Sequence, residues 1–106
     1  MKTLDKRYID IIVKIVQTYS KEKQVCQAIE EMAELTVELN KNINRNKDNQ
    51  KEITLELADV IIMTIELVMI YKIDIDKLYG AIEYKLERQK SRMNNKKNKD
   101  LNCMSD

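Results

Sequence analysis

The chain has 106 residues but no proline and a single glycine, Gly80. These two residue types most often interrupt regular structure, because proline lacks a backbone N–H and glycine is conformationally permissive. No run of valine, isoleucine and tyrosine alternates with polar residues between turn signals, as half-buried strands do. The sequence therefore predicts an all-α fold of long helices joined by short connections.

Apolar residues recur at helical spacing in four segments of the chain. These segments predict helices over about residues 4–19, 21–43, 50–73 and 75–93. Ser20 and Asp74 directly precede two of them and are suited to cap their first turns. Asn49, with Glu52 three residues later, predicts a capping box at the start of the third helix.

The third predicted helix is apolar nearly all round after Leu57, which is typical of a central helix. Three short amphipathic neighbours cannot cover so much apolar surface, and exposed apolar patches mark interfaces. We therefore expect one helical domain over residues 1–93, a four-helix bundle completed by oligomerisation as a homodimer or homotetramer. Residues 94–106 are polar and rich in Lys and Asn, and we expect a disordered tail there.

Composition excludes several classes of function. The 19 basic and 18 acidic side chains give a net charge of +1, whereas dedicated nucleic-acid-binding domains carry a basic excess. The absence of histidine excludes Ser-His and Cys-His catalysis and any histidine-ligated metal. A single glycine excludes a P-loop or a dinucleotide-binding motif, which need more than one. We therefore expect no nucleic-acid partner, and chemistry carried by carboxylates, amines, guanidinium groups, hydroxyls or thiols.

The cysteines and the apolar segments bear on the location of the protein. Cys26 and Cys103 lie far apart and form neither a disulfide framework nor a metal-binding motif. The charged N-terminus is not followed by the apolar run of a secretory signal. The most apolar stretch, residues 57–73, includes Asp59 and Glu66, which are costly in a bilayer. These features predict a cytoplasmic protein that does not span a membrane.

Acidic residues form one face on each of the two middle helices. On the second helix, at about 100° per residue, they occupy one quadrant: Glu30, Glu31, Glu34 and Glu38. On the third helix they are spaced three or four residues apart and share a face: Glu52, Glu56 and Asp59. Such patterns also arise by chance in an acid-rich chain, where they form a solvated face.

The position of Asp59 argues for more than a solvated face. It lies on the most apolar helix, and a buried carboxylate without a partner costs free energy or takes up a proton. If the two helices pack antiparallel, their acidic faces meet and repel, and a bound divalent cation offsets that repulsion. Carboxylate oxygens without histidine or cysteine select a hard cation. The pattern therefore predicts a site for Mg²⁺, with Mn²⁺ as a substitute.

The two acidic motifs together resemble the signature of a known superfamily. Residues 30–34 read Glu-Glu-Met-Ala-Glu and residues 56–59 read Glu-Leu-Ala-Asp. In this order, they are similar to the Glu-Glu-x-x-Glu and Glu-x-x-Asp motifs of the MazG-like all-α nucleoside triphosphate pyrophosphohydrolases. The apolar residues after Asp59 also resemble the second motif helix of that superfamily. The resemblance covers about residues 25–92.

The resemblance implies a MazG-like helical bundle, a magnesium site and a reaction. The implied metal ligands are Glu31, Glu34, Glu56 and Asp59. Glu30, Glu31 and Glu34 are the implied catalytic residues, with Glu30 as an outer partner, a second-metal ligand or the base for the attacking water. The implied reaction cleaves a nucleoside or deoxynucleoside triphosphate between the α and β phosphates, which yields the monophosphate and pyrophosphate.

Basic side chains that suit the phosphates of a substrate occur on the fourth predicted helix. Lys85, Arg88 and Arg92 are spaced at i, i+3 and i+7, so they lie on one face. The superfamily often carries basic residues in this region, which makes the three residues candidates for substrate binding. They fit equally well a solvated basic helix end that complements the helix dipole.

A second interpretation of the sequence needs no catalysis. The chain would then be a helical interaction module whose acidic ridge binds a basic partner, an antitoxin-like oligomer, or a protein that binds nucleotides without turnover. The aromatic residues are five tyrosines, with no Phe or Trp, so the sequence does not indicate which base a nucleotide would carry. Magnesium-dependent release of pyrophosphate separates the two interpretations.

Overall fold

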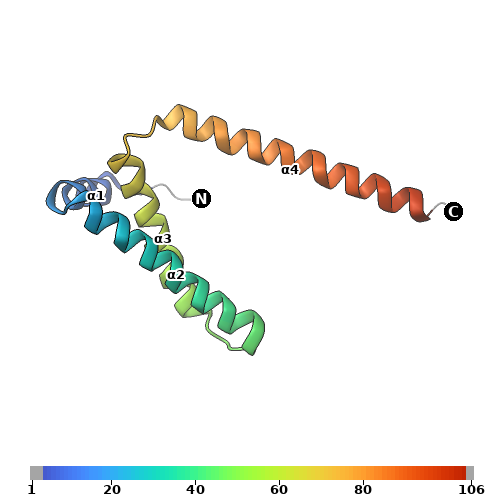
Figure 1. The fold of residues 1–106 in the computed structure, drawn as a ribbon, viewed down its shortest axis with the longest axis horizontal. Helices are drawn as coiled ribbons and strands as arrows, with labels where there is room; N and C mark the ends of the chain where they lie inside the picture. The colour runs from blue at the N-terminus through green and yellow to red at the C-terminus, as the bar shows by residue number, and fades with distance from the viewer. Residues whose placement is uncertain (1–3, 105–106) are drawn as a thin grey trace. The chain divides into compact units, whose positions relative to one another are not determined.

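The computed structural model describes residues 4–104, except for the side chains of residue 98 and residues 100–104. Over this range the chain forms four helices and no strand (Figure 1). The helices are Lys6–Thr18 (α1), Lys21–Arg45 (α2), Gln50–Ile70 (α3) and Ile75–Met104 (α4). The all-α prediction is confirmed.

Side-chain caps start three of the four helices. Asp5 caps α1, with its Oδ1 accepting a hydrogen bond of 2.8 Å from a backbone N–H of the first turn. Ser20 caps α2, with its Oγ accepting from the N–H of Lys23 at 3.2 Å. Asp74 caps α4, with its Oδ1 accepting from the N–H of Asp76 at 2.8 Å. The caps predicted at Ser20 and Asp74 are therefore confirmed.

The capping box predicted at Asn49 and Glu52 is wrong. Asn49 occupies the N-cap position of α3, but its side chain makes no capping hydrogen bond. Its Nδ2 instead donates to the backbone oxygen of Glu38, at 2.9 Å, and to Glu38 Oε2, at 2.7 Å. Asn49 is only 1% exposed, so its amide must be satisfied inside the protein. Tertiary bonds to α2 thus replace the local cap.

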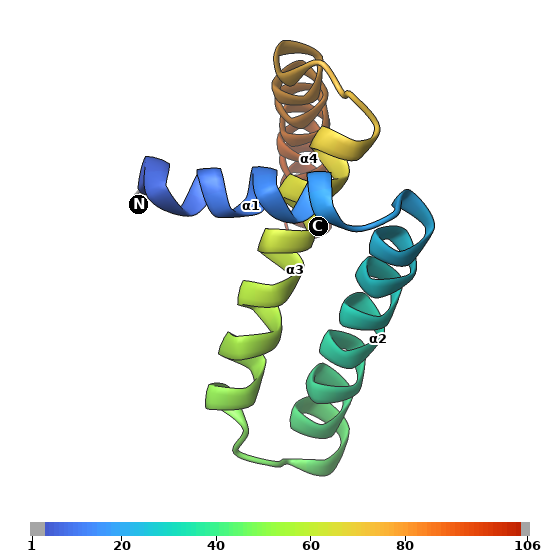
Figure 2. The same cartoon turned by 90° about the vertical axis from the view of Figure 1, so that its left-hand side faces the viewer.

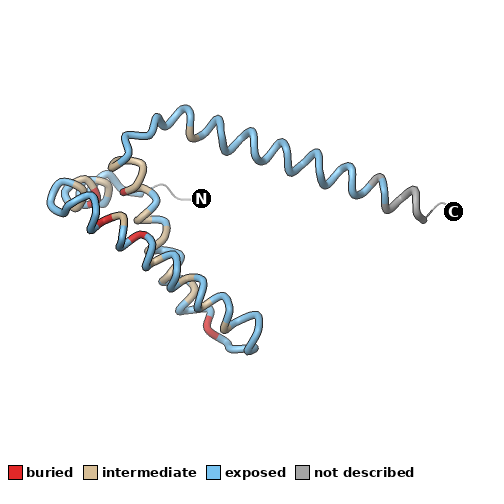
Figure 3. The backbone as a smooth tube through the Cα atoms, in the orientation of Figure 1, coloured by how far each residue is buried: buried red, intermediate tan, exposed pale blue. Residues whose placement is uncertain are grey.

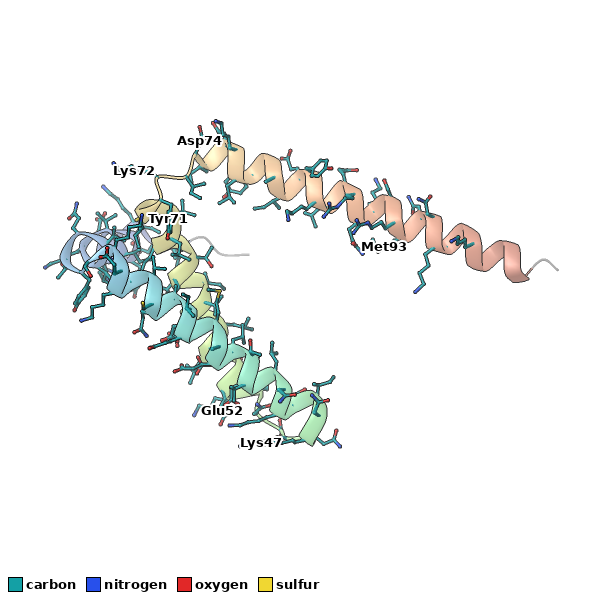
Figure 4. The ribbon with its side chains drawn as sticks, viewed as in Figure 1. Lys47, Glu52, Tyr71, Lys72, Asp74 and Met93 are labelled. Carbon is teal, nitrogen blue, oxygen red and sulfur yellow. The ribbon has the colours of Figure 1, made fainter. Side chains whose placement is uncertain are left out.

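The described end of α4 differs from the sequence prediction. The helix continues past Met93, labelled in Figure 4, to Met104, through most of the segment for which we expected a disordered tail. This segment holds no proline or glycine, so each further residue adds a helical hydrogen bond without an interruption. Residues 105 and 106 of the expected tail lie outside the described residues.

The chain divides into two compact units, which meet between Lys72 and Ile73. In the first unit, α2 and α3 lie side by side as an antiparallel hairpin, and α1 packs across α3 (Figure 2). Lys72, just after α3, has a left-handed backbone conformation with a φ of 51°. The second unit contains α4. The single domain expected over residues 1–93 spans the boundary between the units and stays a prediction.

Few apolar side chains are buried in the described part of the chain. Those that are buried are Ile12, at 5% exposed, and Ala28, at 1% (Figure 3). Even on the apolar α3, Leu55 is 58% exposed and Ile61 is 57% exposed. Uncovered apolar surface of this kind is typical of chains that pack against another molecule. None of the described helices combines the length and hydropathy that a membrane span requires.

Candidate metal centre

The turn between α2 and α3 is built from polar side chains. Asn46, the C-cap of α2, has a φ of 52°, a left-handed conformation that Asn adopts more readily than most residues. Figure 4 shows Lys47 and Glu52 at this end of the hairpin. The buried Asn49 then joins the start of α3 to Glu38 of α2. The turn therefore anchors one helix to the other at a defined position.

The residues that this anchor joins are a reference for which other residues of the two helices lie level. Glu31 lies seven residues before Glu38, and Glu56 lies seven residues after Asn49. Seven residues make about two helical turns, so each carboxylate stays on the same face as its anchoring residue. Antiparallel packing therefore brings Glu31 and Glu56 to the same height on facing sides of the hairpin.

Three carboxylates converge at this height. One oxygen from each of Glu31, Glu56 and Asp59 lies within 4.8 Å of the other two, and we call these residues the carboxylate cluster. Glu31 comes from α2, and the other two come from adjacent turns of α3. Two oxygens bound to one Mg²⁺ at about 2.1 Å lie at most about 4.2 Å apart. A small inward rotation of the side chains therefore suffices for them to share one cation.

Two oxygens of the carboxylate cluster are buried without a hydrogen bond. No described residue donates to Oε2 of Glu31 or to Oε2 of Glu56. The other oxygen of Glu31, Oε1, accepts a bond of 2.7 Å from Nε2 of Gln27, one turn earlier on α2. Because a buried acceptor without a partner is costly, the two Oε2 atoms indicate a place for a donor or a cation.

Burial and repulsion by acidic neighbours raise the pKa of two members of the carboxylate cluster, Glu31 and Glu56. The pKa of Glu31 is raised above its ordinary value, first by burial and then by the charges of Asp59 and Glu34, although the bond from Gln27 opposes the shift. The pKa of Glu56 is raised by burial and then by the charges of its acidic neighbours, Glu34 first. A divalent cation reverses this balance, because it favours the ionised form of every nearby carboxylate.

Lys41 of α2 does not neutralise the carboxylate cluster. Among the described residues, the ion pair that forms joins Lys41 to Glu38, with Nζ and Oε1 separated by 3.3 Å. The hydrogen bond from Asn49 lowers the pKa of Glu38, and Lys41 lowers it further. Glu38 is thus a satisfied carboxylate that holds the hairpin together, whereas the carboxylate cluster is left without compensating charge.

Two of the predicted acidic site residues lie outside the converging set. Glu34 is not among the three carboxylates that share the 4.8 Å spacing, yet its charge raises the pKa of both Glu31 and Glu56. Glu34 is therefore a close neighbour of the cluster. Glu30, the predicted base or outer partner, is exposed on α2 and also lies outside the set.

The basic residues predicted to bind phosphate lie on α4, in the second unit of the chain. Lys85, Arg88 and Arg92 are all exposed. The guanidinium carbon of Arg88 lies 5.8 Å from the centre of the Tyr84 ring, a cation–π contact within its own helix. The role of these residues in substrate binding stays a prediction.

The sequence interpretation missed three polar residues that shape this region: Gln24, Gln27 and Glu66. Gln24 is 6% exposed and Glu66 is 2% exposed. A signal for them was present, because Gln24 and Gln27 precede Glu31 by seven and four residues, and Glu66 follows Asp59 by seven. This spacing continues the two acidic faces along the hairpin towards α1.

No protein-family model, curated protein or solved structure matches this chain.

Proposed function

We propose that the protein is a Mg²⁺-dependent nucleoside triphosphate pyrophosphohydrolase of the MazG-like type. It cleaves a nucleoside or deoxynucleoside triphosphate to the monophosphate and pyrophosphate. The observation that carries the proposal is the convergence of Glu31, Glu56 and Asp59 within 4.8 Å, with buried Oε2 atoms on two of them. The order and spacing of the two acidic motifs, which resemble those of the superfamily, add support.

The donor set suits a hard divalent cation. Glu31, Glu56 and Asp59 offer carboxylate oxygens alone, and the charge of Glu34 acts on both Glu31 and Glu56. Such ligands favour Mg²⁺ or Mn²⁺ over the softer metals. When bound, the ion neutralises phosphate charge and makes a coordinated water more acidic.

The residues of the chain have separate tasks in this proposal. The carboxylate cluster holds the metal, and Gln27 fixes the orientation of Glu31 through its bond to Oε1. Glu34, one helical turn after Glu31, provides a further ligand. Glu30 directly precedes Glu31 on α2 and is exposed to solvent. We assign it the role of the base that accepts a proton from the attacking water.

We also infer that the active form is a homodimer or homotetramer in the cytoplasm. The support is the exposed apolar surface of the first unit, which includes Ile29 of α2, at 58% exposed, and Leu55 of α3, also at 58%. A second copy covers such a surface without changing the hairpin. Light scattering tests this inference, and a mass equal to one chain would contradict it.

The experiment that tests the reaction is a pyrophosphate-release assay over a panel of ribonucleotides and deoxyribonucleotides, with and without Mg²⁺. We expect release from at least one substrate, and only with the metal. Asp59→Asn and Glu34→Gln abolish it, while the circular dichroism spectrum stays helical. Asp10→Asn, the same chemical change on an exposed part of α1, is the matched control and keeps the activity. Unchanged activity in both site variants removes the assignment.

One observation favours the alternative, a non-catalytic interaction module. Large apolar side chains are also exposed along α4, including Tyr79 at 61%, Leu86 at 65% and Met93 at 56%. A helix of this kind suits a partner helix as well as it suits an enzyme subunit. The module predicts neither pyrophosphate release nor stabilisation of the folded chain by Mg²⁺, so the assay and a thermal melt distinguish the two functions.

A further inference from the structure

A second polar site lies on the same hairpin, between the carboxylate cluster and α1. It is a cavity of about 220 Å³ that all three helices of the first unit line. Its apolar wall includes Ile15, Tyr19 and Met63, and its polar wall includes Gln24, Gln27 and Glu66. We call it the Gln24–Glu66 cavity.

Two of the residues that line this cavity, Gln24 and Glu66, each carry a buried acceptor without a partner. Gln24 and Glu66 are 6% and 2% exposed, and no described residue donates to Oε1 of either side chain. The amide of Gln24 cannot be flipped, because its Nε2 already donates to the backbone oxygens of Tyr19, at 2.7 Å, and Val16, at 3.2 Å. The unpartnered atom of Gln24 is therefore an acceptor, and the cavity offers two acceptors to a ligand.

The walls of the cavity restrict the chemistry of that ligand. Two acceptors require N–H or O–H donors, because leaving them unpaired is costly. Lys23 and Glu66 both line the cavity, so the opposite charges of these two side chains offset each other and favour a neutral ligand. The ring of Tyr19 and the side chains of Ile15 and Met63 suit a flat, mostly apolar body. These properties together describe a neutral heteroaromatic ring that carries an amino group.

The size of the cavity supports the same conclusion. Drug-sized ligands occupy pockets of about 300–1,000 Å³, whereas one water takes about 30 Å³. At about 220 Å³ the cavity is too small for a whole nucleotide but large enough for one ring system. It therefore suits one part of a larger molecule whose remainder lies outside.

A side chain connects the cavity to the carboxylate cluster. Gln27 lines the cavity and also donates to Oε1 of Glu31 at 2.7 Å. Gln24 precedes Glu31 by seven residues, and Glu66 follows Asp59 by seven. At 1.5 Å per residue, both acceptors lie about 10 Å along the hairpin from the cluster. A molecule with a ring in the cavity thus has its other end near the cluster.

We propose that the Gln24–Glu66 cavity binds the base of the nucleotide and selects bases that carry an exocyclic amino group. This inference rests on the proposed function. The amino group of adenine, cytosine or guanine donates to the two unpartnered acceptors. Uracil and thymine carry no exocyclic amino group, and each presents a carbonyl oxygen where cytosine carries its amino group, which sets acceptor against acceptor.

Phosphate-free nucleosides test this proposal apart from the metal site. In an NMR titration of the full chain without Mg²⁺, we expect adenosine, cytidine or guanosine to shift the Gln24 side-chain amide, and to bind at least about tenfold more tightly than uridine and thymidine. Glu66→Met removes one acceptor at similar size, and it reduces the ratio to about one. Glu83→Met, the same change at an exposed position of α4, leaves the ratio unchanged.

Two results of the nucleoside titration would overturn the base assignment. One is equal binding of all five nucleosides, or none, by a chain with well-dispersed spectra. The other is an unchanged ratio in Glu66→Met. Pyrophosphate release that depends on Asp59 but shows no preference for amino bases also contradicts base binding in the cavity. The proposed function is then unaffected. Selective binding of nucleosides without any pyrophosphate release contradicts the proposed pyrophosphohydrolase activity. The proposal of base binding in the cavity is then unaffected.

Discussion

The α2–α3 hairpin holds buried carboxylate oxygens at two places that differ in their surroundings. In the carboxylate cluster, acidic neighbours add to burial in raising the pKa of Glu31 and Glu56. In the Gln24–Glu66 cavity, Glu66 is the acid among the lining residues, and burial alone accounts for its raised pKa. Each place leaves a buried oxygen without a hydrogen-bond donor, but only the carboxylate cluster brings several acidic side chains together.

This difference indicates different ligands for the two places. Converging charges are relieved by a cation, whose field acts on all of them at once. A lone buried carboxyl beside an amide oxygen is relieved by a proton or by a neutral donor. In the function that we propose, one hairpin binds the two chemically distinct ends of a nucleotide, because its acidic residues form a group at one height and a single carboxyl at the other.

The largest expected effect is on the response to Mg²⁺. A ligand at a hundred times its dissociation constant stabilises the folded chain by about 2.7 kcal/mol, and we expect Asp59→Asn to lose most of that gain. Glu66→Met should keep it, because Glu66 is not one of the converging carboxylates and lies about two helical turns from Asp59. Thermal melts with and without Mg²⁺ measure both. If Mg²⁺ stabilises Asp59→Asn as much as it stabilises the native chain, the metal binds elsewhere. Asp10→Asn is the control.

A smaller effect is expected when the link between the two places is removed. Gln27→Leu deletes the donor to Glu31 and one polar wall of the cavity. Loss of a hydrogen bond to a metal-binding side chain typically weakens metal affinity by about 10–100-fold. Titration with Mn²⁺, followed by electron paramagnetic resonance, gives the affinity directly. Gln17→Leu on exposed α1 is the matched control, and equal affinities in the two variants would show that Gln27 does not orient the cluster.

The acidic faces were predictable from the sequence because they depend on helical periodicity alone. Glu31, Glu56 and Asp59 share faces at a spacing that any α-helix imposes. Antiparallel packing of neighbouring helices with a short connection was enough to bring those faces together. The all-α class and the caps at Ser20 and Asp74 follow from equally local rules.

The tertiary hydrogen bonds were not predictable in the same way. Asn49 reads as a local cap, and its bonds to Glu38 appear only when α2 lies beside it. Glu66 reads as a polar interruption of an apolar helix, and its burial depends on how α1 crosses α3. Gln24 donates from its side chain to the backbone oxygens of Val16 and Tyr19, near the end of α1. No rule of sequence spacing identifies these partners.

The next expected effect concerns stability and its dependence on pH. Because burial raises the pKa of Glu66 above its ordinary value of 4.5, the folded chain binds a proton at this residue more tightly than the unfolded chain does. The contribution of Glu66 to stability is therefore best at low pH and declines as pH rises through the raised pKa. We expect Glu66→Met to be more stable near pH 7 by about 1–2 kcal/mol, the cost of an unpartnered buried group.

Chemical denaturation from pH 5 to pH 8 measures this difference. The gap between Glu66→Met and the native chain should widen as pH rises, and Glu83→Met should show no such trend. The carboxylate cluster adds a slope of the same sign, but it is common to both proteins and cancels in the comparison. Parallel curves for the native chain and Glu66→Met would contradict a buried, proton-binding Glu66.

The smallest expected effect is at the turn between α2 and α3. Asn49→Ala removes the Nδ2 bonds to Glu38 and should destabilise the chain by about 1 kcal/mol, the typical contribution of a buried hydrogen bond. For a unit of this size, that corresponds to a decrease of about 4–8 °C in melting temperature. Asn44→Ala, at an exposed position near the end of α2, is the control and should change it little.

Asn49→Ala also separates two explanations of how the carboxylates come to lie level. If Asn49 sets the register, its loss lets α3 slide against α2, and both Mg²⁺ affinity and the preference for amino bases decline together. If packing along the hairpin sets the register, the chain becomes less stable but both affinities persist. A thermal melt combined with the Mn²⁺ and nucleoside titrations distinguishes these outcomes. Asn49 lies about two helical turns from the cluster, so a decrease in both the metal affinity and the base preference indicates that its effect is transmitted through the register of the two helices.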